Sequence, residues 1–448
     1  MTIIPESQTF DQHTLTLMQE HDPIVQRYRT FFALFDWSAV PEPPLDRSRP
    51  GRRPHPHSAY VKALLLKINE GFHQCTQVRR FLVEHPLLVL ELGFRPVLDV
   101  KEPYGFDVQR TVPTARWLSQ QQRTLTQPLL QALLVATVQD LCAEIPGLGE
   151  TVAFDVTHLY AYVQENNPRA YVTARYHKEH QPTGDPDCKL GVKRSTNKEQ
   201  PDGSTKEEKE YLWGYGSGVA SATVPGYGDV VVAEYTLPFN ENDITYFVPL
   251  YIRTVATLGF FPTHITADAA FDAWYTYQMV VYRRGIAAIP LNQHGHPESQ
   301  RASDGVPLCA KGLRMHPTYQ FSHTYGYLSQ RFRCPLLFPH ANGQSCDHPQ
   351  FLKEKGCVKD LNWELGGQMR VTLDRESPLY KSIYTQRTST ERINSQSKAL
   401  GIKRPKVRNL HSVRNLNTLT YLVINARALQ RARDLNASLL TTQLGKVA

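Results

Sequence analysis

Four polar side chains near the C-terminal end of the chain have a spacing that could serve phosphodiester chemistry. They are Tyr384, Arg387, Glu391 and Lys398, within YTQRTSTERINSQSK. On a helix, steps of three, four and seven residues keep such side chains within one stripe. This arrangement places a carboxylate between a guanidinium and an ammonium. The carboxylate could hold a divalent metal while the two cations bind phosphate. The alternative is a surface helix whose charges pair at helical spacing.

All four positions match the Tyr-x2-Arg-x3-Glu-x6-Lys signature, so the stretch resembles bacterial insertion-sequence transposases of the DDE superfamily. The resemblance implies that Glu391 is the third acid of a metal-binding triad on an RNase H-like core. It therefore requires two Asp residues upstream, each at the end of a hydrophobic strand. Asp155, near the end of the β-rich segment TVAFDVTHLY, and Asp268, after the short β segment 263–267, meet this requirement.

Asp272 is the rival for the second position. We favour Asp268 because it follows the strand directly, and the carboxyl ends of strands are where α/β sheets assemble ligands. Asp272 should lie in the first turn of the following helix, where its charge would favour the helix dipole. The text TADAAFD resembles the second-Asp motif of the same transposases.

The resemblance also implies the site's cofactors and partners. We expect two Mg²⁺ (or Mn²⁺) ions, with Asp155 bridging both, Asp268 holding one and Glu391 the other. We expect double-stranded DNA, both terminal inverted repeats and target, to be contacted by Tyr384, Arg387, Arg392 and Lys398. Water would make the first attack and DNA 3′-hydroxyls the later ones. A homodimer is expected because two DNA ends must be processed together.

One departure from the family pattern lies after the polar stretch that follows Asp155. Relatives often have Gly-Tyr-Lys and a nearby His there, whereas this chain has Gly214, Tyr215, Gly216, Ser217 and Gly218. A cation close to the phosphate or metal is therefore missing.

The elements that must position these residues predict an α/β protein. We expect an RNase H-like mixed-sheet catalytic core, interrupted by an insertion and preceded by an all-helical domain that is either DNA-binding or a packing module. The predicted boundaries are an N-terminal arm and basic Pro-rich linker at 1–57, helices at 58–148, the first part of the core at 149–290, a Cys/His-containing insertion at 291–380, the last part of the core at 381–434 and a tail at 435–448.

Within the core, alternating segments predict strands at 212–224 and 229–237, a helix from Asn242 or Asp243 to Gly259, and a strand after Gly285. Lys193 to Glu210 is almost entirely polar and predicts an exposed, mobile loop. Apolar residues from Leu410 to Leu429 recur at helical spacing and predict a long closing helix that leaves its arginines outside.

The predicted insertion contains Cys309, Cys334, Cys346 and Cys357. Four thiols are enough for a structural Zn²⁺ site. No Cys-x2-Cys pair is present, however, so buried thiols acting as small apolar side chains are the alternative.

Composition is consistent with a globular protein that binds a polyanion. The 448 residues are 41% hydrophobic and 21% charged, with a net charge of +8 and a pI near 9.0. Basic residues dominate 387–433, as expected of a nucleic-acid surface, although a solvated basic face is the alternative. No apolar run has transmembrane length and no secretion signal is recognisable, so we expect a cytoplasmic protein that is nucleoid-associated when bound to DNA.

Three functions remain open on sequence alone. The first is a DNA transposase that cuts and pastes an element by metal-dependent strand transfer. The second is a related nuclease or domesticated transposase that binds or nicks DNA without transposing. The third is a non-catalytic, zinc-stabilised DNA-binding protein.

Overall fold

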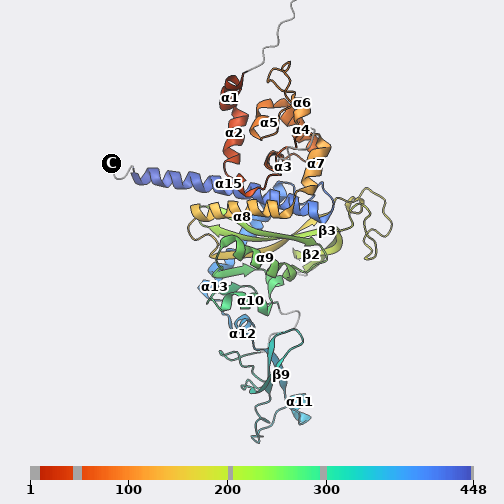
Figure 1. Ribbon diagram of the computed structural model, residues 1–448. Coiled ribbons are helices and arrows are strands. Elements are labelled where there is room, and N and C mark those ends of the chain that lie inside the picture. Colours follow the sequence, from red (N-terminus) through yellow and green to blue (C-terminus); the bar gives the residue numbers. More distant parts are fainter. Residues whose placement is uncertain (1–10, 44–52, 200–204, 293–299, 445–448) are drawn as a thin grey trace, which may run out of the picture.

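A mixed sheet of six strands lies at the centre of this mixed α/β protein (Figure 1). The computed structural model describes residues 11–43, 53–199, 205–292 and 300–444. The strands are β1 (Thr151–Tyr160), β2 (Lys189–Glu199), β3 (Thr205–Val224), β4 (Gly228–Pro238), β5 (His264–Ala267) and β6 (Ile286–Ala288). Their order is β2-β3-β1-β5-β6. β4 also pairs with β3, along residues 215–224, whereas β2 pairs with residues 205–214. β3 is antiparallel to β1, β2 and β4, whereas β5 and β6 are parallel to β1.

Helices cover both faces of this sheet. Adjacent residues of β3 show the two faces, because Ala220 packs in the core beneath α9 (Asp243–Leu258) and α10 (Trp274–Val281). Val219 packs in the core beneath α14 (Thr388–Ala399) and α15 (Leu410–Leu444). The predicted strands at 212–224, 229–237 and after Gly285 are therefore confirmed, as is the helix that ends at Gly259.

Glycines in β3 allow α9 to lie close to the sheet. A Cβ atom on Gly218 would be 2.7 Å from Cδ1 of Tyr246, and one on Gly216 would overlap the Tyr246 hydroxyl. Tyr246 is itself buried. The glycines at which a family cation is missing thus have a packing role in this chain.

The N-terminal region is helical, as predicted. Its helices are α1 (Gln12–His21), α2 (Pro23–Phe32), α3 (His57–Asn69), α4 (Cys75–Glu84), α5 (Pro86–Glu91), α6 (Val108–Thr111), α7 (Ala115–Thr124) and α8 (Gln127–Glu144), with a 3₁₀ turn η1 (Trp37–Ala39). The prediction of an arm at 1–57 is wrong for α1 and α2, because Val25 and Phe32 are buried in the same core as α3. Part of the basic linker, residues 44–52, lies outside the described residues.

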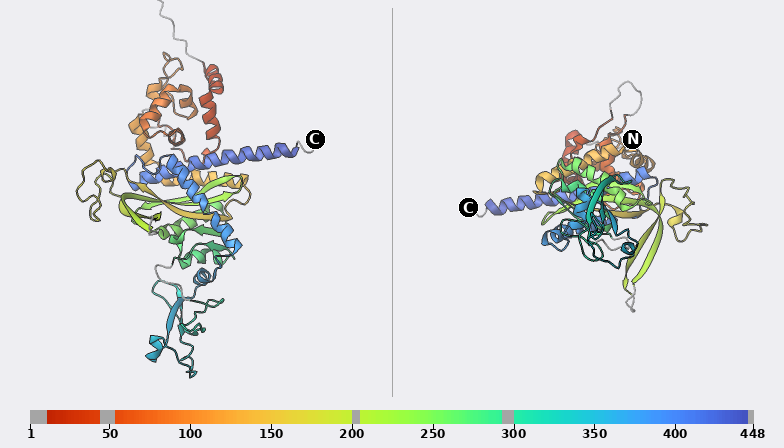
Figure 2. Two further views of the ribbon diagram at one scale, coloured as in Figure 1. Left: turned by 180° about the vertical axis from the view of Figure 1, so that it is seen from behind. Right: turned by 90° about the horizontal axis from the view of Figure 1, so that it is seen from below.

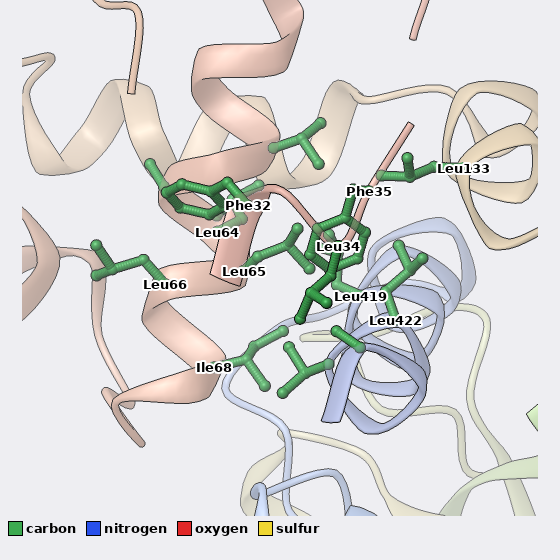
Figure 3. Close-up of a cluster of buried hydrophobic side chains, with 14 of the residues drawn as sticks. Phe32, Leu34, Phe35, Leu64, Leu65, Leu66, Ile68, Leu133, Leu419 and Leu422 are labelled. Atoms are coloured by element: carbon green, nitrogen blue, oxygen red, sulfur yellow. The ribbon is translucent and has the colours of Figure 1, made fainter. Parts of the chain in front are cut away.

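This N-terminal core closes onto α15 (Figure 3). Leu64, Leu65 and Ile68 of α3 lie beside Leu419 and Leu422 of α15 in one buried cluster. In Figures 1 and 2, α15 runs between the N-terminal helices and the sheet, and its C-terminal part projects beyond the body. Residues 435–444 of the predicted tail continue α15 as a helix, and residues 445–448 lie outside the described residues.

The prediction that α15 leaves its arginines outside holds for Arg427, which is exposed, and is wrong for Arg414 and Arg433, which are partly buried. All three contact neighbouring elements. Arg414 donates to the carbonyl of Thr236 on β4, Arg427 donates to Asn69, and Arg433 pairs with Glu144. These contacts join α15 to the sheet, to α3 and to α8. Buried backbone and side-chain acceptors at these junctions need donors, which long guanidinium side chains can supply.

The prediction of a loop over Lys193–Glu210 is also wrong, because β2 and β3 extend through it as an antiparallel ribbon. Seen from below, the ribbon projects from the body (Figure 2, right). The sequence of residues 193–210 is almost entirely polar, so it lacks the apolar alternation that identifies a half-buried strand. Residues 200–204 lie outside the described residues.

In chain order, a small three-stranded antiparallel sheet follows β6 and precedes α14. It consists of β7 (His316–Ser322), β8 (Leu328–Arg333) and β9 (Val358–Asn362), followed by α12 (Leu365–Thr372) and α13 (Pro378–Thr385), with α11 (Pro349–Leu352) before β9. These elements lie within the predicted insertion at 291–380, apart from the end of α13. No helix in the described part of the chain combines the length and apolarity needed to span a bilayer.

Candidate functional site: an acidic cluster at the sheet edge

Two of the predicted acids lie side by side on neighbouring strands. Phe154 of β1 pairs in parallel register with Ala267 of β5, so the next residues, Asp155 and Asp268, are adjacent. Asp268 follows β5 and accepts a hydrogen bond from the Ala270 amide at 2.9 Å. The prediction that Asp155 lies near the end of its strand is wrong. Asp155 lies in the middle of β1, because the strand continues to Tyr160. The register alone therefore brings together carboxylates that are far apart in sequence.

These carboxylates carry more negative charge than their surroundings compensate. Burial and then the charge of Asp268 raise the pKa of Asp155 to about 6, with a smaller contribution from Glu391. Burial also raises the pKa of Asp268, while Arg387 opposes that rise. Asp155 and Asp268 therefore both lie within electrostatic reach of Arg387. Asp155 also lies within electrostatic reach of Glu391.

A further acid, Asp243, belongs to this cluster. It is the first residue of α9 and lies among the residues that line a cavity of about 630 Å³ beside Ala270. Burial, then Asp268 and Asp155, raises its pKa to about 7. The sequence suggested only a helix cap here, and Asn242 occupies the cap position without a side-chain hydrogen bond. An acid that begins a helix directly after a strand was the only sequence signal for Asp243.

Glu391 lies on α14 within electrostatic reach of Asp155. Its carboxylate accepts a hydrogen bond from Arg387 at 2.8 Å and is 55% exposed, so it is freer to move than Asp155. One turn further on, Asn394 donates from Nδ2 to the Asp155 carboxylate at 2.8 Å. Asn394 was missed by sequence reasoning. Its position three residues after Glu391, on the same helix face, is the signal that could have identified it.

The donor set fits a hard divalent cation. Three or four carboxylates repel one another here, and Asn394 Oδ1 is among the buried oxygens of the described residues that have no hydrogen-bond partner. Oxygen donors of this kind are the ligands that Mg²⁺ prefers. In the present arrangement, no three His, Cys, Asp or Glu side chains within the described ranges lie close enough together to enclose a metal ion. The Arg387-bound carboxylate of Glu391 would have to turn toward Asp155.

The prediction that the four signature residues share one helix is wrong. Tyr384 belongs to α13, and the chain turns at Gln386 and Arg387 before α14 begins at Thr388. Tyr384 stacks on Tyr380 with ring centroids 5.8 Å apart, and the Arg387 guanidinium lies 5.6 Å from the Tyr384 ring centroid. The turn still keeps Tyr384, Arg387 and Glu391 in one chain of contacts.

Lys398 lies at the other end of α14 and is exposed. Burial, then Lys193 and Lys403, lowers its pKa, while Asp155 raises it. His158 on β1 lies within reach of the same charges. Burial, then Lys193 and Lys398, lowers its pKa to about 4. Lys398 thus contributes positive charge beside the acidic cluster.

Arg392, predicted to contact DNA, is paired with a residue of the protein itself, although half of its side chain is exposed. Its guanidinium forms a two-pronged pair with Asp229 of β4, at 2.6 and 2.7 Å, and donates to Thr388. Asp229 is buried, with only 6% of its side chain exposed. The pair holds α14 against the sheet, and contact with DNA by Arg392 stays a prediction.

Asp272 has a structural role. The prediction that it lies in the first turn of the following helix is wrong, because α10 begins at Trp274. Asp272 ends the 3₁₀ turn η3 (Ala269–Phe271), and its carboxylate is fully buried. Arg370 of α12 donates to both of its oxygens, at 2.9 and 2.6 Å, and Tyr277 and the Asn292 amide complete its shell. A carboxylate satisfied in this way is not available to a metal, which supports the choice of Asp268.

The four cysteines of the predicted insertion are not disulfide-bonded. Cys357 packs against the apolar cluster of Cys309 and against that of Cys334 and Cys346. Burial, then the other three thiols, raises the pKa of Cys357. In the described arrangement no three of these thiols lie close enough together to hold a metal ion, and they pack as apolar side chains. The Zn²⁺ site therefore stays a prediction that metal analysis of the purified protein can test.

No protein-family model matches the sequence, and no curated protein is similar enough to it in sequence to count as a relative.

Proposed function

We propose that the chain is a DNA transposase that cleaves and joins DNA with the help of divalent metal ions. The observation that carries the proposal is the adjacency of Asp155 and Asp268 at neighbouring parallel strands, with Glu391 on α14 near enough to raise the pKa of Asp155. The complete Tyr-Arg-Glu-Lys signature over α13 and α14 supports it. A purely structural acidic cluster would be an unfavourable feature, because burying like charges together costs stability.

We infer further that the core is RNase H-like. The order β4-β3-β1-β5-β6, with three antiparallel strands followed by two parallel ones, supports this. The first acid lies on the central strand, and the second follows the neighbouring parallel strand. The small sheet enters the chain between the second acid and Glu391, where the resemblance places an insertion.

In this proposal Asp155, Asp268 and Glu391 hold the metal ions, with Asp243 beside them. Bound Mg²⁺ or Mn²⁺ would activate the attacking oxygen and stabilise the leaving oxygen of the phosphodiester. Asn394 holds the Asp155 carboxylate in place through its hydrogen bond. Arg387 and Lys398 bind phosphates on either side of Glu391, and Tyr384 packs against a displaced nucleotide. A homodimer would bring two DNA ends together.

The decisive experiment uses the full chain with a labelled duplex that carries the DNA flanking its gene, in Mg²⁺ or Mn²⁺. Strand-transfer products support a transposase, and nicking without joining supports the nuclease or domesticated alternative. Glu391→Gln should abolish the chemistry and leave DNA binding intact. Glu376→Gln is the matched control, because Glu376 is highly exposed and pairs only with Lys381 among the described residues. DNA binding by the parent without any chemistry would favour the non-catalytic DNA-binding protein.

A further inference from the structure

A strip of basic side chains leads away from the acidic cluster along β1. After Asp155, β1 continues for five residues to Tyr160. The segment after α14 returns beside it, where the Tyr160 amide donates to the carbonyl of Lys403 at 3.0 Å. Arg408 Nε donates to the Tyr162 carbonyl at 3.2 Å. The backbone therefore fixes residues 403–408 next to the end of β1.

Two tyrosine rings hold the cations of this segment in place. Arg404 and Lys403 lie 4.3 and 5.8 Å from the ring centroid of Tyr160. Lys406 and Arg408 lie 4.9 and 5.4 Å from that of Tyr162. Contacts of this kind are worth roughly 0.5–1 kcal/mol each at exposed sites, enough to favour an ordered position. We call these four cations, with Lys398, the basic ridge.

The charge of the basic ridge is not neutralised within the protein. No carboxylate of the described residues forms a salt bridge with any of its five cations, and all five are exposed. Two acids lie nearby without a salt bridge to these cations among the described residues: Glu210 accepts a hydrogen bond from the Tyr160 hydroxyl, and Asp187 accepts one from the Leu410 amide. Uncompensated, exposed cations on a fixed backbone are a feature of phosphate-binding surfaces.

We propose that the basic ridge binds the phosphate backbone of duplex DNA and leads the duplex away from the acids that cut it. The inference rests on the proposed function. The rise of β1 from Asp155 to Tyr160 is roughly 17 Å, which corresponds to about five base pairs. Duplex is favoured over single-stranded DNA because the cations occupy a face of each tyrosine ring that a base would otherwise stack on.

The ridge continues toward the N-terminal helices. Lys406 and Tyr162 line a cavity of about 400 Å³ together with Lys67 of α3, His73 and Arg116 of α7. Positive side chains from two parts of the chain therefore lie along one path. DNA that follows the ridge would reach the helical region, which gives that region a place in the complex.

The test compares two double variants that each remove two positive charges. Arg404→Ala/Lys406→Ala changes the basic ridge. Arg283→Ala/Arg284→Ala is the control. These two residues precede the N-terminal end of β6, whereas Asp268 follows the C-terminal end of the parallel strand β5. Affinity for a 25-base-pair duplex is measured by fluorescence anisotropy across a salt series, and thermal unfolding verifies that both variants fold.

We expect the ridge variant to bind roughly tenfold more weakly and the slope of log K against log salt to fall by about two. The control variant should keep the parent's slope, and Arg404→Lys/Lys406→Arg should retain most of the affinity. Hydroxyl-radical footprinting should lose protection about five base pairs from the cut. An unchanged slope and footprint in the ridge variant would overturn the proposal.

The same samples separate this inference from the proposed function. A parent protein that cleaves DNA, with a ridge variant that binds like the control, leaves the enzyme intact and removes the ridge. A parent that never cleaves, but whose binding depends on the ridge, removes the enzyme and keeps the DNA path. A preference of the ridge for single-stranded over duplex DNA would also contradict the proposal.

Discussion

At the scale of single residues, the acidic cluster is a place where the fold accepts unfavourable electrostatics. Burial and mutual repulsion raise the pKa of Asp155 to about 6 and that of Asp243 to about 7. An acid with a raised pKa binds protons more tightly in the folded state than in the unfolded one. The folded protein is therefore stabilised at low pH and loses that stability as pH rises from about 4 toward 7.

Asp155→Asn should make this cost visible. Without metal, the variant should be more stable than the parent at pH 8, by on the order of 2 kcal/mol, and the two should converge near pH 4. The comparison with the parent matters because His158, with a lowered pKa, acts in the opposite direction over the same pH range. Chemical denaturation in EDTA measures the difference. A gap that shrinks as pH rises would contradict the assignment.

Mg²⁺ should reverse the order. The parent at pH 8 should gain stability with Mg²⁺ concentration, because a cation that binds only the folded state stabilises it, whereas Asp155→Asn should gain little. At pH 5 the parent's gain should be smaller, since protons compete for the same carboxylates. Thermal unfolding with and without Mg²⁺ measures this, with Glu376→Gln as the control that behaves like the parent. An equal gain in both proteins would place the metal elsewhere.

At the scale of elements, α14 depends on contacts that a sequence pattern cannot show. Ser389 hydrogen-bonds Ser221 of β3 at 2.8 Å, and Arg392 pairs with the buried Asp229 of β4. The helix is thereby held over the strand that carries Asp155. Arg392 looked like a DNA contact because charge in a sequence does not reveal its partner, which lies 163 residues away.

Arg392→Ala should therefore act on stability more than on DNA contact. Removing the guanidinium leaves the buried Asp229 carboxylate without its partner, which costs roughly 1–3 kcal/mol. The double variant Asp229→Asn/Arg392→Ala should recover part of that loss. Denaturation measures the stability, and the salt slope of DNA binding should be unchanged. A slope reduced by about one, with stability intact, would restore the original prediction of a phosphate contact.

The packing of α9 against β3 yields a second test at this scale. Gly216→Ala should destabilise the protein by roughly 1–3 kcal/mol, because the new methyl group meets the Tyr246 hydroxyl. That hydroxyl is among the buried groups of the described residues without a hydrogen-bond partner, so Tyr246→Phe should cost little. Tyr246→Phe/Gly216→Ala should be more stable than Gly216→Ala alone. Additive losses in denaturation experiments would show that the clash is not with the hydroxyl.

The same elements show what sequence could and could not predict. Asp155 and Asp268 were found because apolar alternation identifies a half-buried strand, and the acids interrupt or follow such segments. Their adjacency needed the register of β1 and β5, which is a long-range pairing. The β2–β3 ribbon was missed because the sequence of residues 193–210 is almost entirely polar. Asp243 was taken for a cap because nothing local distinguishes a capping acid from one that faces two distant carboxylates.

At the scale of the whole molecule, α15 joins the N-terminal helices to the sheet. Leu419 and Leu422 pack into the N-terminal core, whereas Tyr421 and Ile424 pack into the core above the sheet. One helix therefore contributes to two apolar cores with alternate faces. Loss of packing on either face of α15 should therefore lower the stability of both the N-terminal helices and the sheet.

Leu422→Ala tests this coupling. Removing a fully buried leucine side chain should cost about 2–5 kcal/mol. Because α15 belongs to both cores, we expect the N-terminal helices and the sheet to lose stability together, in one thermal transition at a lower temperature. Leu440→Ala is the matched control, since Leu440 lies on the same helix and is 61% exposed. Hydrogen exchange then assigns the loss: faster exchange confined to the N-terminal helices, with β1 and β3 unchanged, would mean that the two cores unfold independently.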